Sequence, residues 1–257
     1  MAKKDRHTLK KYFQTGRLPS SDQFADLIDS MLNVIEEGFH KTAEDGFKIS
    51  QLDNTGKLVS FYENIDVKSP AWTLQLDMNS GSLIFSNQRN PNVLSLATEQ
   101  RMDAADAETA ENVRVGINKK NASFELDVAG TVASSGRIGA EGEKIAADGN
   151  WHDITKELDG CHAYEVMAGV GKKGSGKYAL LHAFVLNTFG GKGKIKYHQA
   201  HYGSRCNRIK LRWQKKKSRR YALQLKTKCC YGEGIFVRVY LSRLWFDPFM
   251  KMCQATE

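Results

Sequence analysis

The residues from Gly171 to Lys177, GKKGSGK, have the spacing of a phosphate-binding loop, in which backbone amides and a lysine hold phosphate groups. Tyr178, however, stands where a Ser or Thr would hold the magnesium ion. Such a loop also needs a helix whose N-terminus faces the phosphates, and residues 178–188 are instead typical of a strand. We therefore predict a basic hairpin tip here and no nucleotide cofactor.

A second concentration of charge lies between Trp213 and Tyr221, and consists of Lys215, Lys216, Lys217, Arg219 and Arg220. One hypothesis is that these side chains contact a polyanion, such as nucleic acid or an acidic glycan. The other is that they form a solvated hairpin loop. Because no aromatic residues are spaced along a strand face and no nucleic-acid motif is present, the sequence favours the loop and disfavours nucleic acid. A cell-surface glycan stays open as a partner.

The sequence shows no catalytic constellation. It lacks the G-x-S-x-G motif of a nucleophile elbow. Asp153, Glu165 and Glu233 are the candidate carboxylates of the C-terminal region, and they are too few to predict a two-carboxylate hydrolase. We expect no catalytic residue, and a protein that is not an enzyme.

The sequence also disfavours a metal site and a disulfide framework, because the cysteines are odd in number and contain no C-x-x-C pair. The five cysteines are Cys161, Cys206, Cys229, Cys230 and Cys253. His182, His198 and His201 could be imagined as ligands near Cys206, but His198 and His201 would lie on opposite faces of a strand. We expect free thiols and no metal.

Charge is divided unevenly along the 257 residues, a length that suggests one or two compact units. Residues 1–150 carry 17 Lys and Arg against 22 Asp and Glu, whereas residues 151–257 carry 21 against 7. The basic part could face a polyanion or an acidic neighbour in an assembly. The sequence has no apolar run long enough for a membrane span and no apolar signal-peptide core. We therefore expect a cytoplasmic product that leaves by lysis or as part of a particle.

Residues 20–38 are predicted to form a helix, with Ser20 as its N-cap, Gln23 completing a capping box and Gly38 as its stop. Its apolar residues recur at the spacing of one helix face. These residues are Phe24, Leu27, Ile28, Met31, Leu32 and Ile35. One short helix cannot bury such a stripe by itself, so we expect it to be an assembly face.

Short strands are predicted in the middle of the chain at 58–62, 72–76 and 82–85, between turn residues. They look short and polar, so a monomer would bury little apolar area there. Residues 102–112 could form a helix or a loop. The C-terminal strands are expected at 163–170, 178–188, 195–202, 208–214, 221–227 and 235–244. Their alternation of apolar and basic residues, as in Ile209, Lys210 and Leu211, indicates an antiparallel β-sandwich.

Three stretches carry a resemblance to known proteins. Residues 115–139, VGINKKNASFELDVAGTVASSGRIG, separate the polar strands from the basic region and resemble the junction in phage tail-fibre proteins, where a β-rich shaft meets a terminal head. Residues 9–30, LKKYFQTGRLPSSDQFADLIDS, are similar to N-terminal segments of tail and baseplate-associated proteins of contractile injection systems in Bacteroidota. Residues 151–247 also resemble the head domains attached to such fibres.

These resemblances imply a mainly β protein with three parts: a helical docking segment at 1–46, a trimeric shaft-like region at 47–143 and a β-sandwich head at 144–257. We expect a non-enzymatic structural component of a contractile injection system or phage tail-like particle. Its expected partners are two copies of itself and other baseplate or tail proteins. A receptor- or glycan-binding fibre tip is the alternative, and a toxin payload is a third hypothesis.

Overall fold

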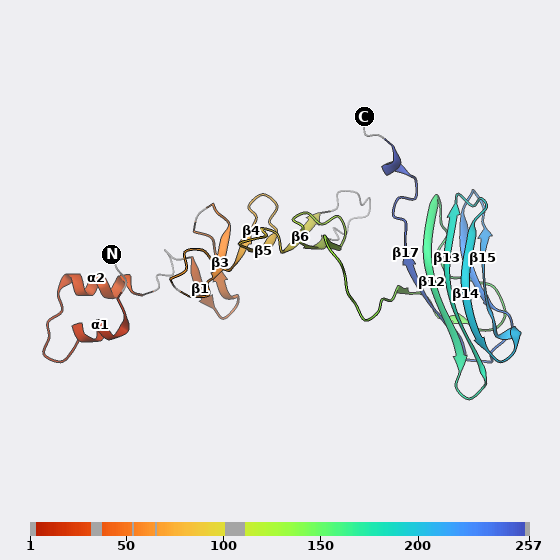
Figure 1. The fold of residues 1–257 in the computed structure, drawn as a ribbon, viewed down its shortest axis with the longest axis horizontal. Helices are drawn as coiled ribbons and strands as arrows, with labels where there is room; N and C mark the ends of the chain where they lie inside the picture. The colour runs from red at the N-terminus through yellow and green to blue at the C-terminus, as the bar shows by residue number, and fades with distance from the viewer. Residues whose placement is uncertain (1–3, 32–37, 53, 65, 101–110, 255–257) are drawn as a thin grey trace. The chain divides into compact units, whose positions relative to one another are not determined.

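The computed structural model describes residues 4–31, 38–52, 54–64, 66–100 and 111–254. The chain divides into two units, Met1–Ala133 and Ser134–Glu257. The fold is mainly β, with several antiparallel sheets and two α-helices among the described residues. Figure 1 shows the elements in chain order, from the helices in red to the last strand in blue.

Unit 1 begins with two short helices, α1 (Arg6–Tyr12) and α2 (Ser21–Asp29). Asp5 caps α1 by accepting from the amides of His7 and Thr8. The predicted capping box of α2 is present, since Ser20 and Gln23 each bond the other's backbone amide. The sequence interpretation missed α1, whose signal was the Asp5 cap before a run of helix formers.

The helix predicted for residues 20–38 corresponds to α2. Its predicted length was wrong, because α2 ends at Asp29 with Ser30 as its C-cap. The Ser30 hydroxyl donates to the Asp26 carbonyl at 2.7 Å and accepts from the Lys4 amide at 3.0 Å. Such local side-chain bonds compete with continuation of a helix. The predicted stripe residues Leu32 and Ile35 lie outside the described residues.

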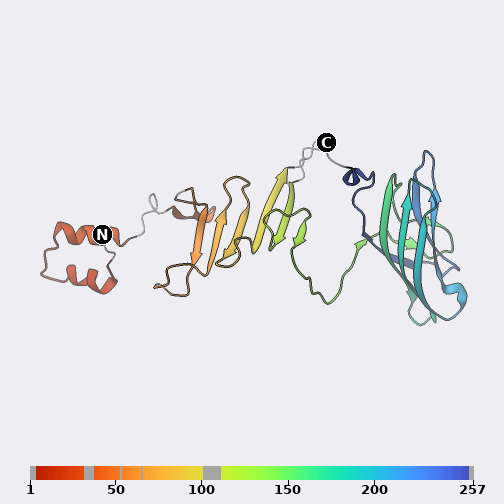
Figure 2. The same cartoon turned by 45° about the horizontal axis from the view of Figure 1, so that its top comes forward.

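The rest of unit 1 is a hairpin and a six-stranded sheet. The hairpin pairs β1 (Phe39–Thr42) with β2 (Gly46–Ile49). The sheet has the order β3-β4-β5-β6-β7-β8, and Figure 2 shows its strands side by side. They are β3 (Lys57–Phe61), β4 (Trp72–Leu76), β5 (Leu83–Asn87), β6 (Leu94–Gln100), β7 (Glu111–Ile117) and β8 (Leu126–Val128). Residues 101–110, which hold most of the undecided segment, lie outside the described residues.

Unit 2 contains a large sheet in the order β10-β17-β12-β13-β14, with β9 also paired to β17. Its strands are β9 (Ala140–Glu141), β10 (Ile145–Ala146), β12 (Cys161–Lys172), β13 (Lys177–Thr188), β14 (Lys194–Tyr202) and β17 (Phe236–Arg243). A small sheet has the order β11-β16-β15, from β11 (His152–Asp153), β15 (Ile209–Lys215) and β16 (Tyr221–Thr227). Two 3₁₀ turns complete the unit, η1 (Arg205–Asn207) and η2 (Lys251–Cys253).

The two sheets of unit 2 share one buried core. Val166, Leu181 and Val239 contribute from the large sheet, and Leu223 and Leu225 from the small sheet; each is at most 1% exposed. All six strands predicted for residues 151–257 are present, with ends shifted by a few residues at most. Alternation explains this agreement, since each strand places every second residue in the core.

The structure confirms two smaller predictions. Residues 171–177 form the tip of the β12–β13 hairpin, where Lys172 pairs with Lys177 on either side of a turn at 173–176 and a strand, not a helix, follows. His198 and His201 lie on opposite faces of β14, because one pairs with His182 on the exposed face and the other with buried Ala179.

Candidate functional site

The six-stranded sheet has one continuous apolar face, which we call the apolar sheet face. Its residues are Val59, Phe61, Trp72, Leu74, Leu76, Leu83, Phe85, Leu94, Leu96, Val115, Ile117, Leu126 and Val128. The strand register joins them directly from strand to strand, as in Leu74 with Phe85 and Leu96 with Val115. None of these side chains is buried within the described structure. Trp72 is 44% exposed and Leu126 is 61% exposed.

The opposite face of the same sheet carries mostly polar side chains around the buried Ile84. Thr73, Ser86 and Ser95 occupy it, and the Ser86 hydroxyl donates to the Thr73 hydroxyl at 3.2 Å. Ile84 and Ala122 are the buried apolar side chains among the described residues of unit 1. The sequence predicted that a monomer would bury little apolar area in this region, and few apolar side chains of unit 1 are buried among the described residues. Strand alternation gathers the apolar residues of the six strands onto one face, which the sequence analysis did not predict.

The predicted assembly face on α2 is partly visible. Phe24, Ile28 and Met31 are 49%, 63% and 55% exposed, and Leu27 is half-buried. Phe24 also packs edge-on against Phe13, with ring centroids 5.4 Å apart. The four described members of the stripe therefore remain largely accessible.

The predicted polyanion-binding loop is the turn between β15 and β16, but its charges are not all available. Lys216 donates to Asp153 at 2.9 Å, and Arg220 lies 3.6 Å from Glu157. Lys215, Lys217 and Arg219 form no ion pair with any residue that the structure describes. Two of the five predicted cations are thus partly neutralised.

Glu165 is the centre of a polar cluster that the sequence interpretation did not assemble. One guanidinium nitrogen of Arg137, Nη2, donates to both carboxylate oxygens, at 2.9 and 2.7 Å. His182 Nε2 lies 2.7 Å from Oε1 of the same carboxylate. The hydrogen bond to His182, together with the charge of Arg137, holds the pKa of Glu165 below its ordinary value although burial opposes this.

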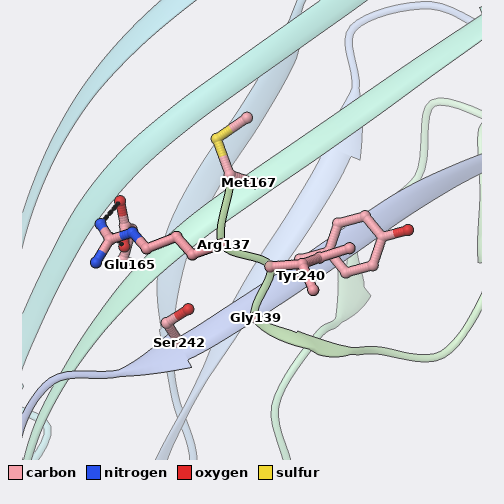
Figure 3. A pocket seen from close by; sticks show the side chains of 7 residues that line it. Arg137, Gly139, Glu165, Met167, Tyr240 and Ser242 are labelled. Atoms are coloured by element: carbon pink, nitrogen blue, oxygen red, sulfur yellow. Dashed lines mark hydrogen bonds and ion pairs between the residues drawn. The ribbon is translucent and has the colours of Figure 1, made fainter. Parts of the chain in front are cut away.

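The cluster lies beside a hollow of about 330 Å³ on the outer face of the large sheet (Figure 3). Its lining residues are Arg137, Ile138, Gly139, Glu165, Met167, Tyr240 and Ser242. Gly139 allows the close approach of this segment, because a Cβ there would lie 2.6 Å from the carbonyl carbon of Leu241. Arg137 and Gly139 therefore attach the beginning of unit 2 to strands β12 and β17.

The candidate carboxylates do not form an acid–base pair. Both oxygens of Glu165 are occupied, and its lowered pKa keeps it ionised at neutral pH. Asp153 lies in the small sheet and accepts from Lys216 and Gln224. Burial raises the pKa of Asp153, but these hydrogen bonds leave it below the ordinary value. Glu233 is exposed in the loop between β16 and β17.

The thiols are free, and two of them share a partner. The sulfur atoms of Cys206 and Cys229 lie 3.9 and 3.6 Å from Oδ1 of Asn207. Burial raises the pKa of Cys229 to about 11. Within the described residues, no group of three or more His, Cys, Asp or Glu side chains could hold a metal ion.

No protein-family description matches this chain, and no curated protein sequence matches it either. Within the described residues, no helix is both long enough and apolar enough to cross a membrane. The apolar sheet face is an accessible apolar surface that spans all six strands of this sheet.

Proposed function

We propose that this protein is a non-enzymatic structural component of a phage tail-like particle or contractile injection system. In this proposal its copies associate through the apolar sheet face as a homotrimeric shaft. The supporting observation is the contrast between the units: unit 2 buries a core of its own, whereas unit 1 leaves its largest apolar surface open. Soluble proteins rarely expose a contiguous patch of this kind unless it is an interface.

A copy of the same chain is the partner that fits this face best. The face is apolar from β3 to β8, and an identical face on a second and third copy offers matching strands of the same length. Three such sheets around one axis cover each other's apolar residues, and cyclic symmetry closes the assembly without further growth. The resemblance of residues 115–139 to a shaft–head junction supports three copies over two.

The other parts of the chain have consistent roles in this proposal. The α1–α2 pair, with Phe24, Ile28 and Met31 exposed, docks onto another baseplate or tail protein. Unit 2 forms a β-sandwich head on the outside of a particle that is released by lysis. Its strand β13 adds an exposed apolar row, Tyr178, Leu180, Phe184 and Leu186, that neighbouring heads of a trimer would partly cover.

Multi-angle light scattering on the full chain at micromolar concentration tests the proposal. We expect the mass of three chains. A mass of one chain would refute the role of the apolar sheet face, and a mass of two would refute the trimer. Association with a particle is tested separately by sedimenting particles from cells that encode the chain and probing the pellet with an antibody against it.

A second candidate function is a receptor- or glycan-binding fibre tip. The excess of Lys and Arg in residues 151–257 favours it, because this region contains 21 Lys and Arg residues but only 7 Asp and Glu residues. A glycan-array experiment with the full chain distinguishes this function from a purely structural one.

A further inference from the structure

A row of cations runs along the outer face of the small sheet, away from the turn where the sequence concentrates charge. We call it the basic stripe: Arg208, Lys210, Arg212, Lys226 and Lys228. Strand alternation places Ile209, Leu211 and Leu225 in or against the core, so the basic residues between them point outward. Arg208, Lys210 and Lys228 are exposed, and Arg212 and Lys226 are half-buried.

The register sets like charges opposite each other. Lys210 and Lys226 are direct cross-strand partners. At the end of the same ladder, the Lys228 amide donates to the Arg208 carbonyl at 2.7 Å, so these two cations are also neighbours. Like charges directly opposite one another on a strand pair are destabilising. Among the described residues, no member of the basic stripe forms an ion pair that would relieve this repulsion.

Trp151 and Gln224 hold two members of the basic stripe, Arg212 and Lys226, in place. The guanidinium of Arg212 lies 4.3 Å from the Trp151 ring centroid, and the ammonium of Lys226 lies 5.0 Å from it. Arg212 Nε also donates to Gln224 Oε1 at 2.8 Å. The nearby carboxylates are already engaged, since Asp153 accepts from Lys216 and Asp148 is 2.9 Å from His152.

We propose that the basic stripe is a binding site for an anionic polysaccharide carrying sulfate or carboxylate groups. Successive outward residues of a strand are about 6.6–6.8 Å apart, so the stripe presents a linear series of cations to a linear series of anions. The ligand would neutralise the repulsion between Lys210 and Lys226. This inference rests on the second candidate function, glycan binding, for which it names the residues and the ligand class, and it does not depend on the trimer.

A polysaccharide fits the stripe better than a single-stranded nucleic acid does. Base recognition on a sheet uses open aromatic rings on which bases stack. The face of Trp151 is instead covered by Arg212 and Lys226. The other residues on this face of the two strands, Gln214, Ala222 and Gln224, carry no ring, and Ala222 and Gln224 are buried.

The test is a titration of the full chain with a size-defined heparin oligosaccharide. Tryptophan fluorescence reports binding, and the titration is repeated at a series of salt concentrations. Lys210→Ser with Lys226→Ser should weaken binding about tenfold or more and lower the salt slope by roughly two. Lys172→Ser with Lys173→Ser removes the same charge from the β12–β13 turn and should change affinity less than about twofold. Trp151→Phe should remove the fluorescence response, because Trp151 contacts two of the cations.

Thermal unfolding of the double variant Lys210→Ser, Lys226→Ser provides an independent readout. It should unfold at a temperature close to that of the wild type, because removal of the like-charge pair offsets the loss of the Lys226–Trp151 contact. Equal affinity of the two double variants, or no heparin binding at physiological salt, would overturn the site. Tighter binding of a single-stranded oligonucleotide than of heparin at the same salt would overturn the assignment to a polysaccharide.

Discussion

Arg137 Nη2 donates to both carboxylate oxygens of Glu165, across 28 positions of the sequence. The pair fixes the segment that enters unit 2 onto strand β12, and His182 on β13 contacts the same carboxylate. Glu165 is 9% exposed, so its charge depends on these partners for compensation.

The first prediction concerns this carboxylate. Because its pKa is lowered from 4.5 in the folded state, the stability that it contributes is fully present above pH 4.5 and is lost as pH falls below that value. Glu165→Gln should reduce the free energy of unfolding by roughly 1–3 kcal/mol at pH 7, and by less at a pH below 4.5. Urea unfolding at one fixed protein concentration measures both values.

Glu143→Gln is the matched control, since Glu143 is exposed on the segment just before β10. It should change the free energy of unfolding by less than about 0.5 kcal/mol at either pH. An equal loss for both variants at pH 7, or a Glu165→Gln effect that does not change with pH, would contradict the role given to the cluster.

The second prediction separates the two faces of the six-stranded sheet. Leu96→Asp places a charge on the apolar sheet face and should convert the oligomer into monomers, because burial of an unpaired carboxylate is costly. Ala97→Asp adds the same charge on the opposite face, beside Arg114, and should leave the oligomer intact. Light scattering measures the masses, and an intact oligomer with Leu96→Asp would show that this face is not the interface.

The third prediction concerns docking by the helical pair. Ile28→Asp with Met31→Asp should leave unit 2 folded but prevent incorporation into particles, because it charges two exposed apolar positions of the stripe. The control is Gln14→Asp with Thr15→Asp, at exposed polar positions between the helices. Immunoblots of sedimented particles report incorporation, and equal incorporation of both variants would contradict the docking role.

The fourth prediction concerns Tyr221, which is fully buried and whose hydroxyl donates to the Gly160 carbonyl at 2.8 Å. Burial raises the pKa of its hydroxyl, which therefore stays protonated and able to donate. Tyr221→Phe should lower the free energy of unfolding by roughly 1–2 kcal/mol, because it removes a hydrogen bond from a buried carbonyl. Tyr197→Phe, at a position 58% exposed, should have no measurable effect in the same denaturant experiment.

The sequence alone determined which residues of the C-terminal region form strands. Ile209, Leu211 and Trp213 alternate with Lys210 and Arg212, and a period of two is the direct signature of a strand with one buried face. It also determined the start of α2, because the capping box is a local interaction between Ser20 and Gln23. The strand-like character of residues 178–188 predicted the hairpin tip at 171–177 in the same way.

The tertiary structure decided what the sequence could not, because the remaining features depend on register between distant strands. Arg137, Glu165 and His182 meet only when β12 pairs with β13 and the preceding segment crosses them. The apolar sheet face exists only because each of its strands is paired so that apolar residues meet, and the basic stripe only because Lys210 lies opposite Lys226. A shift of one residue in the strand pairing of either sheet would turn those side chains to the other face.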